Sequence, residues 1–329
     1  MRHLVLALCC LLLCSCAAPV VRKQVLIPAP AAEVARLTRL RVAAFDDDDG
    51  GQVRAAVESA LASVQVDGRP YFTVLGASAS AGDLGKPMQW VDTTKSKARP
   101  IRYGAEGLVE GRVDQNGWQD ERYTEERSEC FVWDDKGHCL RTRTRHVPCT
   151  RRVALFSFTP RVVQKDTGAV LLSQEFTETG QSSACKDRGS PTSGTALLAS
   201  ARARAITRFR NQVAPHSMTL DIPLLTEDDS GMNAQVKTLV SGGKDFAEAG
   251  QTDKACTLWR SAASKHEAGF VLPYLSGVCA ELEDNLTLAE DLYSQAEQRA
   301  GKPVSEITAA LARLRETRAN LDKLEQQRK

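Results

Sequence analysis

A spacing of 34 residues recurs in the last third of the chain and constrains its fold more than any other feature. The segments ACTLWRSA (255–262) and AEDLYSQA (289–296) place small and aromatic residues at matching positions. Four pairs of residues share the spacing: Gly243 and Gly277, Ala255 and Ala289, Trp259 and Tyr293, and Ala262 and Ala296. Such a period is typical of repeated helical pairs, in which small residues let two helices approach and an aromatic side chain fills the remaining gap.

This pattern resembles the tetratricopeptide repeat, whose stacked helical pairs bind peptides or protein helices. The resemblance implies two repeats over residues 232–302, and Phe246 and Gly250 extend the match in the first repeat. Two repeats are fewer than the roughly three that are normally stable alone. We therefore expect residues 303–329 to form a capping helix, although a short coiled coil, interrupted by Arg318, is an alternative. The apolar side of this helix consists of Ile307, Leu311, Leu314, Leu321 and Leu324. A packing module without a ligand is the alternative to a binding module.

The N-terminus has the pattern of a secretory signal. Arg2 and His3 give a positive start, and an apolar segment of ten residues follows from Leu4 to Leu13. Ten residues rise only about 15 Å as a helix, roughly half the hydrocarbon thickness of a bilayer. This segment is therefore too short to span a membrane.

Residues 13–16, with the sequence LCSC, resemble the lipobox of bacterial lipoproteins, in which a leucine, a variable residue and a small residue precede the modified cysteine. The resemblance implies a lipoprotein signal peptide over residues 1–15 and attachment of acyl chains, such as palmitate, at Cys16. Ala17 stands where an aspartate would favour the inner membrane, which implies the outer membrane, on its periplasmic side. The alternative is an ordinary cleaved signal and a free periplasmic protein. Residues 16–35 are expected to be a tether rich in proline and alanine.

Six cysteines remain once the signal and the lipobox cysteine are set aside: Cys130, Cys139, Cys149, Cys185, Cys256 and Cys279. An even number in an exported chain favours disulfides, although six cysteines allow 15 connectivities. In CFVWDDKGHC the two cysteines flank a turn signal centred on Asp134 and Asp135. This arrangement predicts a disulfide between Cys130 and Cys139 across a hairpin.

The other cysteines are less constrained. By elimination Cys149 could pair with Cys185, and a bridge between Cys256 and Cys279 could join neighbouring helices of the two repeats. The alternative to disulfides is a zinc site, although its ligands lack the closely spaced cysteine pairs of common zinc modules. The ligands of that site would be Cys130, Cys139, His146 and Cys149.

Residues 36–225 are predicted to form an α+β domain with a mainly antiparallel sheet and flanking helices. RLRVAAF and YFTVLGA have the β-branched and aromatic residues of strands, and the segment between them has apolar residues at helical spacing. GAEGLVEGRV, residues 104–113, predicts another strand. Residues 151–176 predict two more strands, joined near Gly168, and residues 194–213 predict a helix.

The order of these segments resembles the CsgG-like family of outer-membrane lipoproteins, which includes the curli secretion channel and activators of penicillin-binding proteins. The similarity covers roughly residues 38–215 and is carried by RVAAFDD, YFTVLG, GAEGLVEGRV, RVVQKDTGAVLLSQ and ALLASARARAITRF. It implies a CsgG-like domain over residues 36–225 and envelope proteins as partners, with a homo-oligomer as an option. It also raises the alternative of a channel subunit, because the curli channel inserts two hairpins per subunit into the membrane.

The expected hairpin around residues 120–150 does not suit lipid. A lipid-facing strand needs apolar side chains on alternate positions over about 9 to 11 residues. In CLRTRTRHVPC one face carries Arg141, Arg143 and Arg145, and the other is also largely polar. We therefore expect soluble, disulfide-stapled hairpins, with Arg143 opposite Glu126. The arginines form either a cross-strand charge ladder or a docking surface for an anionic glycan or an acidic protein.

No catalytic, cofactor or metal motif is predicted. The chain has no GxSxG, HExxH or phosphate-binding loop, and its five histidines are scattered. The acidic run Asp46–Asp49 lacks the closing glutamate of a calcium loop, so acidic residues at a helix N-terminus explain it better. The net charge of +2 gives no general attraction to nucleic acid.

These observations predict an outer-membrane-anchored periplasmic lipoprotein that is not an enzyme. It would act as an interaction or assembly module for cell-envelope machinery, such as peptidoglycan synthesis, appendage assembly or export. Its partners would be envelope proteins, bound by the helical repeats and by the α+β domain. A subunit of an oligomeric secretion channel is the alternative.

Overall fold

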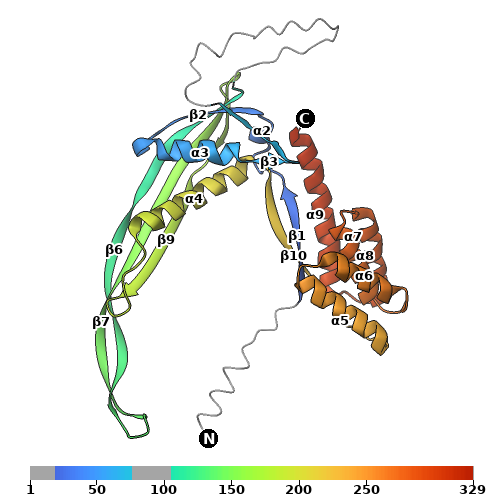
Figure 1. Ribbon diagram of the computed structural model, residues 1–329. Helices are drawn as coiled ribbons and strands as arrows, with labels where there is room; N and C mark the ends of the chain where they lie inside the picture. Colours follow the sequence, from blue (N-terminus) through green and yellow to red (C-terminus); the bar gives the residue numbers. More distant parts are fainter. Residues whose placement is uncertain (1–18, 76–104, 329) are drawn as a thin grey trace, which may run out of the picture. The chain divides into compact units, whose positions relative to one another are not determined.

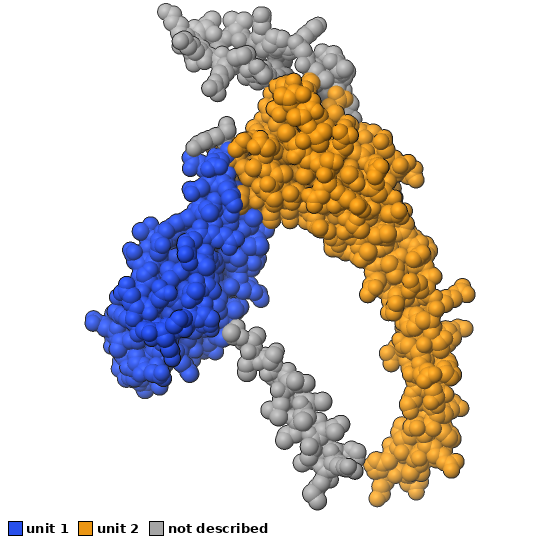
Figure 2. Space-filling view, turned by 180° about the vertical axis from the view of Figure 1, so that it is seen from behind, with its two compact units in different colours: residues 1–27, 217–326 blue, residues 28–216, 327–329 orange. Residues whose placement is uncertain are grey.

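The computed structural model describes residues 19–75 and 105–328, and the predicted signal peptide and Cys16 lie outside these residues. The chain divides into two compact units, shown in different colours in Figure 2. The helical unit contains residues 1–27 and 217–326, and the sheet unit contains residues 28–216 and 327–329. The described residues combine helices with β-sheets, as expected for an α+β protein.

The helical unit includes a two-stranded sheet. It pairs β1 (Val20–Ile27) with β10 (His216–Pro223), two strands from opposite sides of the sheet unit in the sequence (Figure 1). Residue numbers fall along one strand as they rise along the other, so the pair is antiparallel. Three contacts show this: Leu224 N to Pro19 O at 2.8 Å, Arg22 to Asp221 at 3.2 Å, and Gln24 to Thr219 at 2.7 Å.

The presence of β1 corrects the prediction of a tether over residues 16–35. The segment VVRKQVLI is rich in β-branched residues, and Val21 is buried in the core of the helical unit. The ammonium group of Lys23 donates to the backbone oxygen of Glu281 and forms an ion pair with Asp284 at 2.7 Å. The N-terminal strand therefore belongs to the helical unit.

Five helices of the described chain make up the rest of the helical unit. They are α5 (Ala234–Glu248), α6 (Thr252–Ala263), α7 (Val271–Leu282), α8 (Leu286–Ala300) and α9 (Ser305–Arg328). Helix α5 packs on α6, and α7 packs on α8. In α9 the residues Ile307, Leu314 and Leu324 are buried, and Leu311 is partly buried. Of the expected apolar side only Leu321 is exposed, to 53%.

The two helical pairs repeat one packing contact. Trp259 of α6 lies against Gly243 of α5, where an added Cβ would come within 2.2 Å of the indole Nε1. Tyr293 of α8 lies against Gly277 of α7 in the same way, with its ring 2.7 Å from an added Cβ. Both aromatic side chains are fully buried, and the indole donates to the backbone oxygen of Val240 at 3.2 Å. The 34-residue spacing therefore corresponds to a contact that both helical pairs make.

Gly243→Ala is expected to destabilise the helical unit by about 1 to 3 kcal/mol, because the added methyl group must displace the buried Trp259. Gly242→Ala is the matched control: its Cβ would meet only the end of the flexible Leu258 side chain, at 3.3 Å. Alanine also favours a helix over glycine by about 0.5 to 1 kcal/mol. Urea unfolding followed by tryptophan fluorescence measures both variants. Equal losses of stability would contradict the importance of this contact.

A buried ion pair joins α7 to α9. The carboxylate of Glu281, 2% exposed, accepts hydrogen bonds from Nε and Nη2 of Arg313 at 2.7 and 2.8 Å and from the hydroxyl of Tyr293 at 2.8 Å. Burial alone would lower the pKa of Arg313, but the hydrogen bonds and charge of Glu281 outweigh it and raise that pKa. Burial, together with the nearby carboxylate, raises the pKa of Tyr293, which keeps it a neutral donor. Buried charges are tolerated only when they are paired in this way.

The sheet unit is built on a six-stranded mixed sheet with the order β5-β2-β6-β7-β8, in which β9 also pairs with β7 (Figure 1). β2 is parallel to β5 and β6, and the other pairs are antiparallel. The strands are β2 (Arg39–Asp46), β5 (Thr73–Leu75), β6 (Gly107–Trp133), β7 (Cys139–Gln164), β8 (Val170–Ser173) and β9 (Phe176–Cys185). A separate short pair joins β3 (Gln65–Val66) to β4 (Arg69–Pro70).

Helices α3 (Gln52–Ala62) and α4 (Gly194–Val213) pack on this sheet around one hydrophobic core. Phe158 lies at its centre, with ring centroids 5.7 to 6.0 Å from four other phenylalanines. These are Phe45, Phe156, Phe176 and Phe209. The short helix α2 (Ala32–Ala35) contributes Val34 to the same core.

The acidic run after β2 serves as a helix cap. A short 3-10 helix, η1 (Asp49–Gly51), precedes α3. The carboxylate of Asp48 accepts hydrogen bonds from the backbone N–H of Val53 at 3.0 Å and of Arg54 at 2.9 Å. Unpaired N–H groups at a helix start are satisfied in this way, as the sequence predicts.

Candidate functional site

A two-stranded arm extends the sheet unit and is its candidate functional site. β6 and β7 pair along their whole length, but β9 accompanies β7 only from Phe158 to Cys149. Beyond that point β6 and β7 continue as a ribbon that ends in a turn, at the lower left of Figure 1. We call residues 124–148 the arm. About ten residues per strand give it a length of about 33 Å.

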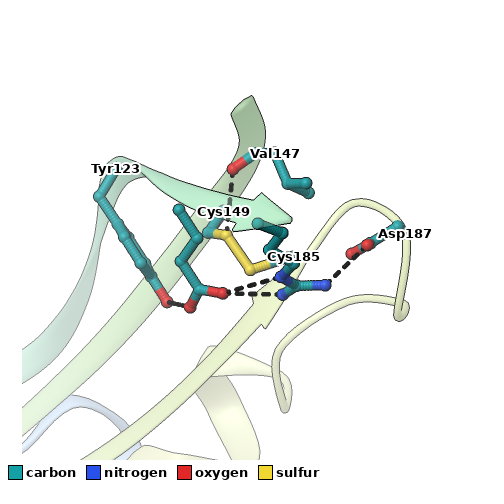
Figure 3. Close-up of a disulfide and its surroundings, with 7 residues drawn as sticks. Tyr123, Val147, Cys149, Cys185 and Asp187 are labelled. Carbon is teal, nitrogen blue, oxygen red and sulfur yellow. Dashed lines mark hydrogen bonds and ion pairs between the residues drawn. A yellow bond between two sulfur atoms is a disulfide. The ribbon is translucent and has the colours of Figure 1, made fainter. Parts of the chain in front are cut away.

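A disulfide closes the base of the arm. Cys149 and Cys185 stand directly opposite each other on β7 and β9, with their Cα atoms 3.9 Å apart. Figure 3 shows the polar groups around this disulfide. Arg127 donates to Glu125 at 2.8 Å and to Asp187 at 2.7 Å, and so ties β6 to the loop that follows β9. The hydrogen bonds from Arg127 lower the pKa of Glu125, which stays ionised.

A second disulfide and a hydrogen-bonded turn fix the tip of the arm. Cys130 is bonded to Cys139, with their Cα atoms 5.8 Å apart. The carboxylate of Asp134 accepts hydrogen bonds from the backbone N–H of Lys136 at 2.9 Å and of His138 at 2.7 Å, and these bonds lower its pKa. Gly137 adopts a φ of 76°, a backbone conformation that favours glycine.

The register of the arm differs from the prediction. Arg143 lies opposite Glu129, at 3.1 Å, and not opposite Glu126. The reason is that Cys130 and Cys139 do not face each other: Cys130 lies opposite Thr142, and Cys139 lies opposite Trp133. The hairpin therefore turns around Lys136, and not around Asp134 and Asp135. Counting from the cysteines assumes that the bonded residues face each other, whereas this disulfide joins residues that do not.

Most charged side chains of the arm and its base form cross-strand pairs. Arg143 and Arg145 both reach Glu129, so two arginines of the expected stripe belong to a charge ladder. The further pairs are His146 with Glu126 at 3.7 Å, Arg151 with Glu121 at 3.6 Å, and Arg152 with Asp120 at 2.7 Å. Each exposed pair contributes only a few tenths of a kcal/mol, so the ladder mainly fixes which strands pair.

The disulfides exclude the zinc alternative. Cys130, Cys139 and Cys149 are all bonded to another cysteine, and His146 is exposed beside Glu126. Potential ligand atoms of Glu125, Cys149 and Cys185 also lie within 4.8 Å of one another, but the two sulfurs form the disulfide at the base of the arm. A sulfur in a disulfide is not the thiolate that zinc requires.

The third disulfide lies in the helical unit. Cys256 of α6 is bonded to Cys279 of α7, with their Cα atoms 5.6 Å apart. It joins the second helix of one pair to the first helix of the next, as the repeat pattern predicts. All six cysteines of the described residues are therefore paired, and the expectation of disulfides is confirmed.

The sequence reasoning missed one feature of the arm. Phe131, Trp133 and Leu140 are exposed around the turn, to 48%, 61% and 61%. The segment CFVWDDKGHCL could have indicated this feature, because turn-forming segments are usually polar and this one contains large apolar residues.

Comparison with known proteins does not assign a family. No family model and no curated protein sequence matches the chain. Among solved structures, the PelC dodecamer from Paraburkholderia phytofirmans is similar in two crystal forms, one of them of a variant. The identity is 14%, the alignment covers 59% of this chain and 98% of PelC, and the TM-score is 0.26. A TM-score of this size is too low to assign a fold or a function.

None of the helices in the described ranges combines the length and the apolar character that crossing a bilayer requires.

Proposed function

We propose that this protein is a lipoprotein of the outer membrane, anchored through Cys16, that acts in the periplasm as a non-catalytic interaction or assembly module. Its two units would each bind components of the cell envelope. The helical unit, a tetratricopeptide-like module in this proposal, would bind a peptide or a protein helix. The CsgG-like sheet unit would bind through its arm.

The observation that carries the proposal is the arm. It is a ribbon held by a disulfide at each end, and it extends past the hydrophobic core of its own unit, which ends near Phe156. Such a ribbon contributes little to that core, so we assign it to an external partner. Three disulfides in one chain support an oxidising compartment such as the periplasm.

Cys16→Ala is expected to abolish lipid attachment and to move the protein from the outer membrane to the soluble periplasm, because several acyl chains provide the anchoring energy. Cys14→Ala is the matched control, because Cys14 occupies the variable position of the lipobox and its replacement leaves the motif intact. Metabolic labelling with a fatty acid and membrane fractionation measure both. Labelling or outer-membrane association that survives Cys16→Ala would refute the anchor, and normal envelope function in that mutant would refute its role.

A subunit of an oligomeric secretion channel is the second candidate function. It is favoured by the length of the arm and by its outer strand edges, which pair with no other strand of the described residues. The native mass of the lipidated protein in a mild detergent distinguishes the two functions. A closed ring of many subunits would support the channel, whereas a monomer or small oligomer would support the interaction module.

A further inference from the structure

The tip of the arm concentrates exposed apolar side chains. The three residues Phe131, Trp133 and Leu140 lie within ten positions of one another around one turn, and each is about half exposed or more. Trp118 is exposed to a similar degree, but the guanidinium of Arg152 lies 4.7 Å from its ring centroid. No such aromatic or cationic contact covers the tip residues within the described part of the chain. Clustered exposure of this kind marks an interaction site.

The backbone beneath these side chains is fixed. The Cys130–Cys139 disulfide lies among them, and the hydrogen bonds of Asp134 close the turn. The three side chains are therefore held outward in a preorganised arrangement, which lowers the entropic cost of binding.

The charges at the tip differ from those along the rest of the arm. Arg143 and Arg145 pair with Glu129, but Lys136 and Arg141 have no ion-pair partner among the residues that the structure describes. Asp135 is also without one, so the tip carries free charges of both signs around its apolar side chains. This combination matches the phosphate and ammonium groups of a phospholipid surface.

We propose that the tip of the arm inserts into the headgroup region of a phospholipid bilayer. Phe131, Trp133 and Leu140 would reach the boundary with the acyl chains, where aromatic rings are favoured. Lys136 and Arg141 would stay at the level of the phosphates, since long cationic side chains keep their charge in water. The charged ladder that begins at Arg143 limits the insertion to the tip.

A bilayer suits this surface better than a protein pocket does. The tip is a projecting turn with unpaired charges of both signs. A fluid bilayer can accommodate such a turn without a concave pocket of matching shape. The inference goes beyond the proposed function, because it does not depend on lipid attachment at Cys16.

Vesicle flotation tests the proposal with the mature chain beginning at Ala17, which carries no acyl group. The probes are vesicles of phosphatidylcholine and of phosphatidylethanolamine with phosphatidylglycerol at about 3:1. We expect binding to both, because the driving side chains are apolar. The double substitution Trp133→Ser with Leu140→Ser should weaken binding by about tenfold or more, which corresponds to about 1.4 kcal/mol.

Two further variants make the test specific. Val170→Ser removes an exposed apolar side chain of β8, 46% exposed, and should leave binding unchanged. Trp133→Phe should retain most of the vesicle binding. Near-UV circular dichroism and a free-thiol assay establish that each variant is folded with its disulfides intact.

Three results would overturn the proposal. They are no flotation of the unsubstituted chain, equal flotation of the double variant, or binding only to the anionic vesicles that is lost at high salt. The last result would show that the basic side chains of the arm, and not its apolar residues, drive membrane binding. Failure of Cys16→Ala to change localisation would bear on the proposed anchor alone.

Discussion

Glu281→Ala is expected to lower the free energy of unfolding of the helical unit by about 3 to 5 kcal/mol. The substitution leaves the guanidinium of Arg313 buried without its carboxylate, and the hydroxyl of Tyr293 without its acceptor. An uncompensated buried charge costs more than a missing contact, because its hydration is not restored. Urea unfolding of the full chain, followed by near-UV circular dichroism, measures the loss.

Glu283→Ala is the matched control, because Glu283 directly follows α7 but forms an exposed pair with Arg260. Its effect should stay below about 1 kcal/mol. Combining Glu281→Leu with Arg313→Met removes both charges and should recover much of the stability. If the double variant were as unstable as Glu281→Ala, the unpaired charge would not be the cause.

Replacing Cys149 and Cys185 with alanine should destabilise the sheet unit by up to about 4 kcal/mol. The two residues are 36 apart in the sequence, and in the chain-entropy account a longer closed loop restricts the unfolded state more. Thermal unfolding measures the loss. Hydrogen exchange should also increase at the end of β9, where the disulfide holds that strand to β7.

The control is the disulfide at the tip. Cys130 and Cys139 are only 9 residues apart, so their replacement should cost less, about 2.5 kcal/mol. It should leave exchange in β9 unchanged. A larger loss of stability at the tip than at the base would contradict the loop-length account for this protein.

Local patterns predicted part of this structure. Gly243 and Trp259 could be recognised because the contact between them recurs after 34 residues, and a repeated contact leaves a repeated spacing. The disulfide between Cys130 and Cys139 could be recognised because both residues flank a turn. In each case residues close in the sequence are close in space.

Contacts over long separations could not be predicted. Strand β1 has a partner almost 200 residues away, and nothing in VVRKQVLI indicates that β10 will pair with it. The ion pair of Glu281 with Arg313 was missed because both residues look like ordinary surface charges of a helix. In the arm, the bonded cysteines do not face each other across the hairpin, so counting from them gave the wrong partner for Arg143.

The pairing of β1 with β10 also sets an order for folding. The first strand of the described residues belongs to a unit whose remaining parts are synthesised after residues 28–216 of the sheet unit. Lys23 contacts Glu281 and Asp284 across more than 250 residues, and contacts of such high sequence separation form slowly. The sheet unit has its own hydrophobic core, so it can fold before β10 is available to pair with β1. During that interval the backbone groups of β1 are unpaired, and a strand in that state is prone to aggregate.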